Sequence, residues 1–201
     1  MKKTCIFMFI AFAIPLFAQQ QTLIKGNVTH GGFAGPVLKY TQMLDQDAFL
    51  VGGRGGWIIG KRLYVGGAGY GLVNKIESKL EYAGTDSARS LYLGLGYGGF
   101  ELGFIVASDR LIHMTFQILI GAGGVAHADM DNLDDINVED MNGDAFFIAE
   151  PAVDVELNVT SFFRICLGAS YRWVSDVDMA EFGDSDISGF AAVLTFKFGR
   201  F

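Results

Sequence analysis

The chain has 201 residues, of which 51% are hydrophobic and only 18% are charged, and its formal net charge is −7. This acidic balance argues against a nucleic-acid partner, which needs clustered lysine and arginine. The hydrophobic content suits a membrane protein, yet beyond the N-terminal segment no apolar run reaches the roughly 20 residues that a spanning helix needs.

Residues 1–18 have the three parts of a secretory signal peptide. Lys2 and Lys3 provide the positive start, Cys5 to Phe17 the apolar stretch, and Ala18 the small residue before the expected cleavage site. The alternative is a retained membrane anchor, for which the apolar stretch is too short. We therefore expect secretion across the inner membrane and cleavage after Ala18.

The mature chain has the length of one domain. We expect a short N-terminal segment over 19–31 and a single domain over 32–201. Cleavage removes one of the two cysteines and leaves Cys166, so no internal disulfide can form. Cys166 is interpreted as a small apolar residue in a strand, because no Cys-His-Asn spacing accompanies it.

Apolar and polar residues alternate in one segment after another, which is typical of strands with two different faces. In the segment 163–173 one face carries Phe163, Ile165, Leu167, Ala169, Tyr171 and Trp173, and the other carries Arg164, Cys166, Gly168, Ser170 and Arg172. The segments 112–121, 150–158 and 190–199 divide in the same way. This pattern predicts one face for lipid and one for a small or polar interior, as in a transmembrane β-barrel.

We predict eight strands, at about 32–43, 47–59, 62–74, 89–107, 111–126, 145–158, 162–175 and 188–200. With this count the long connections (75–88, 127–144 and 176–187) fall on one side, and the short turns near residues 60, 109 and 160 fall on the other. Outer-membrane barrels have this asymmetry and an even number of strands. The predicted fold is a closed antiparallel up-and-down β-barrel. The alternative has ten strands, if the segment 89–107 is two strands and 21–28 adds another.

One strand breaks the alternation. Leucines and Tyr97 occupy odd positions before Gly98-Gly99, whereas Phe100, Leu102 and the following apolar residues occupy even ones. A Gly-Gly hairpin would split the segment into two strands. A bulge would insert one residue and let a single strand continue. We favour the bulge, since a hairpin gives nine strands and places a long loop on the wrong side.

Glycine is frequent, with 27 copies, although it weakens strands in general. In a narrow, curved barrel it relieves crowding where strands bend and where interior space runs out.

A soluble periplasmic ligand-binding barrel is the alternative to lipid contact. Such a protein would bury its apolar face and expose its polar one. The polar face here includes Lys39, Arg54, Glu101, Asp154, Glu156, Arg164 and Arg172. The opposite face carries large apolar residues in nearly every strand, too many to be covered in water, which favours lipid.

These features together resemble the small outer-membrane β-barrel proteins of Gram-negative bacteria. The resemblance rests on the signal peptide, the alternating strands and the C-terminal FKFGRF. In that group the last strand ends on an aromatic residue that the barrel assembly machinery reads, which implies an assembly signal at Phe196, Phe198 and Phe201. Phe196 and Phe198 are out of step with Phe201, which departs from the usual spacing.

An eight-stranded barrel has an interior that side chains can fill, so we expect no aqueous channel. Inward acids and bases could pair, and Glu156 and Arg164, on either side of a short turn, are the predicted interior ion pair. A proton or ion path along such pairs is the alternative interpretation.

Two connections are acidic. The first contains the candidate ligands of a divalent cation: Asp129, Asp131, Asp134, Asp135, Glu139 and Asp140. Calcium favours such oxygen ligands, although the spacing does not match an EF-hand. The second connection, 176–187, adds five more acids. The loops are either solvated or bridged by Ca²⁺ to each other or to lipopolysaccharide phosphates; we expect no other cofactor.

Catalysis has little support. His127, close to Asp129, is the only histidine placed to act as a base, and no serine nucleophile motif accompanies it. We expect a non-enzymatic, monomeric outer-membrane barrel with a structural or surface-binding role, whose partners are outer-membrane lipid and lipopolysaccharide. The alternatives are a lipid-modifying enzyme (hydrolase or acyltransferase) and a narrow transporter or porin-like channel.

Overall fold

The computed structural model describes residues 28–81, 90–128, 143–177 and 183–201. The elements are β1 (His30–Met43), β2 (Gln46–Ile59), β3 (Leu63–Leu72), β4 (Glu77–Glu81), β5 (Ser90–Val106), β6 (Ile112–Ala128), β7 (Gly143–Asn158), β8 (Phe163–Ser175), α1 (Asp184–Ile187) and β9 (Gly189–Arg200). No helix among these residues is long and apolar enough to cross a membrane. The predicted signal peptide lies outside the described residues.

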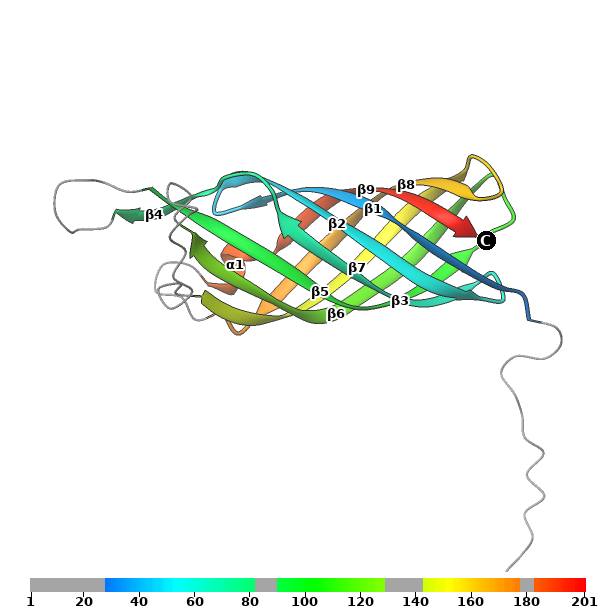
Figure 1. Ribbon diagram of the computed structural model, residues 1–201, viewed down its shortest axis with the longest axis horizontal. Coiled ribbons are helices and arrows are strands. Elements are labelled where there is room, and N and C mark those ends of the chain that lie inside the picture. Colours follow the sequence, from blue (N-terminus) through cyan, green and yellow to red (C-terminus); the bar gives the residue numbers. More distant parts are fainter. Residues whose placement is uncertain (1–27, 82–89, 129–142, 178–182) are drawn as a thin grey trace, which may run out of the picture.

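Eight of the nine strands close into an antiparallel barrel in which neighbours in the chain are neighbours in the sheet (Figure 1). β3 pairs with β5, and β1 pairs with β9, so the sheet has no free edge along the wall. The short β4 pairs only with the start of β5 and extends beyond the barrel. The predicted eight-stranded up-and-down barrel is confirmed, and a tenth strand has no place in the closed wall.

The two ends of the barrel differ. Short turns join β2 to β3, β5 to β6 and β7 to β8 at the end where β1 begins and β9 finishes, which we call the turn end. The segments from β3 to β5, from β6 to β7 and from β8 to β9 leave from the opposite end, which we call the loop end. The β1–β2 turn also lies there, with Leu44 and Asp45 at φ of 52° and 60°.

The strand registers determine the shape of the barrel. The wall can be followed once around by stepping from each residue to its paired residue on the next strand. Starting in β1, the steps are Gly31, Ile58, Tyr64, Gly103, Gln117, Ala152, Ser170, Ala191 and finally Thr41, which is again in β1. One circuit therefore moves from Gly31 to Thr41, ten residues along β1. With a rise of about 3.3 Å per residue and strands about 4.8 Å apart, this shift tilts the strands by about 40° and leaves a narrow interior.

Large apolar side chains cover the outer wall. Near the loop end these include Phe49, Phe147, Trp173 and Phe190, and near the turn end Trp57, Phe104 and Phe198, all of them exposed. Aliphatic residues such as Leu102, Ile118 and Leu167 lie between the two aromatic levels and are also exposed. Outer-membrane barrels have this arrangement, an apolar band between two aromatic girdles.

β5 is one continuous strand, but the predicted bulge at Gly98-Gly99 is wrong. The pairs Tyr97↔Gly123, Gly98↔Ala122 and Gly99↔Gly121 follow without a register shift, and the pairing with β3 is equally regular. The side chains of Leu93, Leu95 and Tyr97 point inward and are buried, whereas Phe100 and Leu102 point outward. The apolar residues change from odd to even positions because the interior of the barrel is apolar towards the loop end and polar further towards its middle. On the outer wall, glycines 94, 96 and 98 have no side chains, so the even positions become apolar only from Phe100 onward.

Inward-facing glycines make room for large neighbours. A Cβ placed on Gly103 would overlap the ring of Tyr64 from the adjacent strand β3, and one on Gly168 would overlap the carboxylate of Asp154. The expectation that glycine relieves crowding inside a narrow barrel is met at these positions.

The substitution Gly103→Ala should displace Tyr64 and destabilise the barrel by about 1–3 kcal/mol, the usual cost of overpacking. The measurement is urea unfolding in phospholipid vesicles, followed by tryptophan fluorescence. Gly71→Ala is the matched control, because a Cβ at this position of β3 meets no atom nearer than 4.0 Å. Equal effects of the two substitutions would contradict the crowding argument.

Candidate functional site

The polar face predicted from the sequence lies inside the barrel. Nine charged side chains and one histidine are no more than 5% exposed: Lys39, Arg54, Glu101, His113, Glu150, Asp154, Glu156, Arg164, Arg172 and Lys197. Since burying a charge without a partner is costly, each of them needs a partner inside the barrel. All of them except Arg172 form three clusters, which follow one another from the turn end towards the loop end.

The first cluster surrounds Glu156 near the turn end. Lys197 Nζ lies 2.5 Å from Glu156 Oε1, and Thr115 donates a hydrogen bond of 2.7 Å to the same oxygen. Glu156 Oε2 lies 3.2 Å from His113 Nε2 and 3.4 Å from Arg164 Nη1. The structure thus brings the predicted pair Glu156 and Arg164 together, but the closest cation is Lys197.

The second cluster is centred on Arg54 of β2. Its guanidinium lies 2.9 Å from Asp154 and 3.4 Å from Glu101, so one cation bridges carboxylates from β7 and β5 across the barrel. Tyr64 donates a hydrogen bond of 2.6 Å to Glu101, and Gln117 donates one of 2.8 Å to Asp154. These hydrogen bonds satisfy part of the acceptor capacity of the buried carboxylates.

The third cluster holds Glu150 of β7. Lys39 Nζ lies 2.5 Å from Glu150 Oε1, and Ser170 donates a hydrogen bond of 2.5 Å to this oxygen. Tyr97 donates to the other carboxylate oxygen at 2.9 Å. The Lys39 ammonium also lies 3.5 Å from the centroid of the Tyr70 ring. This cation–π contact marks the boundary between the charged clusters and the apolar cluster at the loop end.

Arg172 has a different partner from the other buried cations. Its Nε and Nη2 donate hydrogen bonds of 2.8 and 2.6 Å to the carbonyl oxygen of Ile187, the last residue of α1. The Ile187 side chain is fully buried among the apolar residues of the interior. One residue of the β8–β9 connection is therefore anchored inside the mouth of the barrel, although the sequence had indicated only an acidic loop there.

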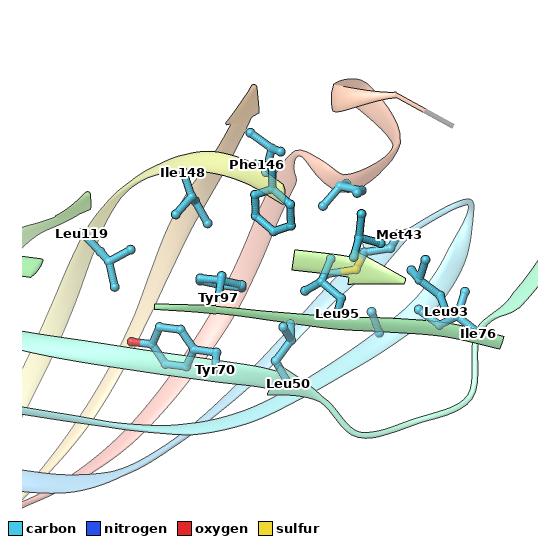
Figure 2. Close-up of a cluster of buried hydrophobic side chains, with 14 of the residues drawn as sticks. Met43, Leu50, Tyr70, Ile76, Leu93, Leu95, Tyr97, Leu119, Phe146 and Ile148 are labelled. Carbon is cyan, nitrogen blue, oxygen red and sulfur yellow. The ribbon is translucent and has the colours of Figure 1, made fainter. Parts of the chain in front are cut away.

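An apolar cluster fills the interior at the loop end (Figure 2). Leu50, Leu95, Phe146 and Ile148 converge from the three strands β2, β5 and β7. Ile187 completes the cluster from α1. These side chains are packed together and nearly all inaccessible, so the interior at this end is a packed apolar core.

A second, smaller cluster closes the turn end. It comprises Phe33, Ile58, Tyr64 and Ile105, with Phe201 packed against it. The Arg164 guanidinium lies 3.8 Å from the centroid of the Phe201 ring. Of the three residues of the predicted assembly signal, Phe198 is exposed on the outer wall, while Phe201 turns towards the interior cluster. This difference follows from their opposite sequence parity.

The predicted cation ligands Asp129, Asp131, Asp134, Asp135, Glu139 and Asp140 lie outside the described residues, and the structure does not describe the side chain of His127. Within the described part of the chain, no three histidine, cysteine, aspartate or glutamate side chains come together as a metal site. Cys166 is buried in the wall of β8. The sequence analysis missed Lys197 as a partner of Glu156; the available signal was its parity, shared with the inward Thr195.

Comparison with known proteins supports the fold. No family model matches the chain, and no curated protein matches its sequence. Among solved structures, Neisserial surface protein A is similar over 87% of this chain and 99% of its own, with a TM-score of 0.57 at 9% identity. The N-terminal β-barrel domain of Pseudomonas aeruginosa OprF matches over 83% and 96% (TM-score 0.49, 9% identity). Yersinia pestis Ail, the attachment invasion locus protein, matches over 86% and 97% (0.45, 10%).

The fold defines a class. The chain has the fold of the small eight-stranded outer-membrane β-barrels of Gram-negative bacteria, the group that its sequence resembles. At 9% identity the similarity extends to the fold and not to a particular activity.

The substitution Glu156→Gln should destabilise the barrel strongly, by about 3–5 kcal/mol, because it leaves the buried cations of the first cluster without their carboxylate. Urea unfolding in vesicles measures the change. The matched control is Asp109→Asn in an exposed pair, where Lys61 lies 2.8 Å away and lowers the pKa of Asp109 by a hydrogen bond and by its charge. The control should unfold like the unsubstituted protein; an equally mild effect of Glu156→Gln would show that the interior ion pairs are dispensable.

Proposed function

We propose that this protein is an integral component of the outer membrane that forms a closed, non-conducting barrel and presents its loop end for structural or binding contacts at the cell surface. The observation that carries the proposal is the distribution of side chains, which is the reverse of that in a water-soluble protein: large apolar residues lie outside and charged residues lie inside. Phe100, Trp173 and Phe190 are 57%, 64% and 77% exposed on the wall, whereas Glu156 and Arg172 are fully buried. In water this arrangement would be strongly unfavourable, and in lipid it is the expected one.

The closed interior supports a structural role rather than transport. Among the described residues, the buried cations have carboxylate or carbonyl partners, and apolar clusters cover the ionic region on both sides. A conducting pore would need a continuous water-filled path through the interior, and an eight-stranded barrel of this tilt has room only for side chains. Non-enzymatic action fits the same picture, since the inward carboxylates and cations are buried in contact with one another, where a substrate has no access to them.

The acidic connection between β6 and β7 provides the second element of the proposal. β6 ends and β7 begins at the loop end, so the six predicted ligands from Asp129 to Asp140 belong to a segment that starts and finishes on this side. In the proposed orientation that side faces the cell exterior, where lipopolysaccharide phosphates are bridged by divalent cations. Carboxylates can share such a cation, and calcium has the coordination flexibility to accept both ligand types.

The lipid-facing orientation is testable with the two tryptophans, Trp57 near the turn end and Trp173 near the loop end, both on the outer wall. In vesicles of lipids with brominated acyl chains, the fluorescence of the folded protein should be strongly quenched relative to ordinary lipids. Trp57→Phe and Trp173→Phe variants report on each level separately. On denaturing gels the unboiled protein should also migrate apart from the boiled one. A soluble barrel would show neither quenching nor a gel shift.

Planar bilayers test the closed interior. The folded chain should produce no reproducible single-channel conductance at neutral pH, because the apolar cluster at the loop end excludes ions. A larger β-barrel with a water-filled channel and known conductance serves as the positive control. Regular conductance steps from this chain would overturn the non-conducting assignment and favour the narrow transporter.

A further inference from the structure

The two ends of the barrel carry surface charges of opposite sign. Four cations at the turn end are exposed or half-buried: Lys61, Arg62, Arg110 and Arg200. Asp109 is the only exposed acidic side chain that the structure describes at this end. Because Lys61 lies 2.8 Å from Asp109, the charges of these two residues offset each other, and the three arginines remain as positive charge.

The loop end is acidic by comparison. Its described part has six aspartates: Asp45, Asp47, Asp144, Asp176, Asp184 and Asp186. Two of them, Asp45 and Asp186, line a groove of about 660 Å³ that β1 forms with β8, α1 and β9. Lys75 is the exposed cation described at this end, and its ammonium lies 4.6 Å from the centroid of the Tyr92 ring. An anionic ligand is therefore favoured at the turn end and disfavoured at the loop end.

Two turns, joined by the ion pair at the turn end, hold Arg62 and Arg110 in place. The Arg62 carbonyl accepts a hydrogen bond of 2.6 Å from the Ile105 amide of β5, and the Arg110 amide donates one of 2.9 Å to the Ala107 carbonyl. Asn158 donates a hydrogen bond of 2.6 Å to the Arg110 carbonyl and ties this turn to β7. The backbone of both arginines is thus fixed, whereas among the described residues no carboxylate pairs with either guanidinium.

An exposed leucine follows each of these two arginines. Leu63 comes after Arg62 and is 41% exposed, and Leu111 comes after Arg110 and is 66% exposed. Leu63 is paired with Phe104 of β5, which also faces outward, so the arginines border on the apolar wall. A cation at the edge of an apolar band lies at the level of lipid phosphates, with acyl chains beside the apolar residues.

Arg200 extends this cationic border across the pair of strands that closes the barrel. It is paired with Gly32 of β1, and Gly32 is paired with Trp57 of β2, so the three residues follow one another around the wall. Gly32 contributes no side chain between Arg200 and the indole. Trp57 is exposed on the outer wall between Arg200 and the β2–β3 turn, which makes it a reporter of the lipid at this border.

We propose that the turn end binds anionic glycerophospholipids, whose phosphate groups contact Arg62, Arg110 and Arg200. Arginine suits this role because its guanidinium offers paired N–H donors to phosphate oxygens. The inference rests on the proposed membrane orientation, in which the turn end lies in the periplasmic leaflet, where the lipids of an outer membrane are phospholipids. A lipid of net negative charge is favoured over a zwitterionic one, because the paired Asp109 is the only exposed acidic side chain described here that could attract a choline or ethanolamine group.

Trp57 provides the measurement in the variant Trp173→Phe, where it is the only tryptophan. The folded chain is placed in phosphatidylcholine vesicles that contain a minor fraction of one lipid with brominated acyl chains. Brominated phosphatidylglycerol should quench Trp57 at least about twofold more strongly than the same fraction of brominated phosphatidylcholine or phosphatidylethanolamine, because each arginine near the membrane surface attracts anionic lipid. In the variant Trp57→Phe, Trp173 near the loop end should show no such excess. Equal quenching of Trp57 by the three lipids, or the same excess at Trp173, would overturn the proposal.

Variants that remove charge test the arginines themselves. Arg200→Gln should remove at least about half of the excess quenching of Trp57, and its combination with Arg62→Gln and Arg110→Gln should remove all of it. Lys75→Gln is the matched control, since it removes an exposed cation from the loop end, and it should leave the excess unchanged. Equal effects of Lys75→Gln and Arg200→Gln would indicate a response to net charge alone and contradict the assignment to the turn end.

Glycerol phosphate without acyl chains distinguishes a lipid from a free phosphate. Added in excess to the unsubstituted arginine set, it should leave the preference for phosphatidylglycerol in place, because the apolar wall contributes to binding the acyl chains. Loss of the preference would show that the arginines bind soluble phosphate and would refute the lipid assignment.

The outcomes separate this inference from the proposed function. A heat-dependent gel shift and quenching by brominated lipid of any headgroup establish the membrane barrel independently of lipid selectivity. If both are observed while Trp57 shows no preference for phosphatidylglycerol, the turn-end inference is wrong and the membrane barrel stands. If both are absent, the proposed function itself fails.

Discussion

Closure of the sheet is the constraint on which the rest of the structure depends. Once β1 pairs with β9 and β3 with β5, every strand of the wall has two partners and the backbone amides and carbonyls are satisfied without water. Closure after only eight strands, with a shift from Gly31 to Thr41, also determines how narrow the interior is. Each inward residue must then be small, apolar and packed, or polar and paired.

The way in which the interior satisfies this packing constraint changes along the barrel axis, from apolar contacts at the loop end to ion pairs further inside. At the loop end Leu50, Leu95 and Phe146 pack with Ile187 of α1, and below them Glu150, Arg54 and Glu156 each gather partners from several strands. Buried ion pairs often contribute little net stability relative to apolar residues of the same volume. Their value here lies in specificity: each pair joins particular strands, so a slipped register would leave buried charges unpaired.

The outer wall and the loop end have separate roles. The wall provides an apolar band with aromatic residues at two levels, which is a general solution to spanning a membrane. Distinctive chemistry is concentrated at the loop end, where the acidic connections leave the barrel and where the groove beside α1 combines Ala192 with Asp186. Because barrels of this class share their walls, differences in function are expected in such connections.

Sequence alone was enough to predict the barrel, because lipid outside and a crowded interior impose a period of two that is visible in segments such as 163–173. It also predicted which charges face inward and that Glu156 could meet Arg164. Sequence could not assign Lys197 as the nearest partner of Glu156, since that contact depends on the register between distant strands. Nor could it distinguish a bulge at Gly98-Gly99 from a change of interior character, because both produce the same parity switch. The groove that β1 forms with β8, α1 and β9 was likewise decided by tertiary structure, because only closure of the barrel makes the first and last strands neighbours. The anchoring of Ile187 by Arg172 depends on how α1 packs into the mouth of the barrel.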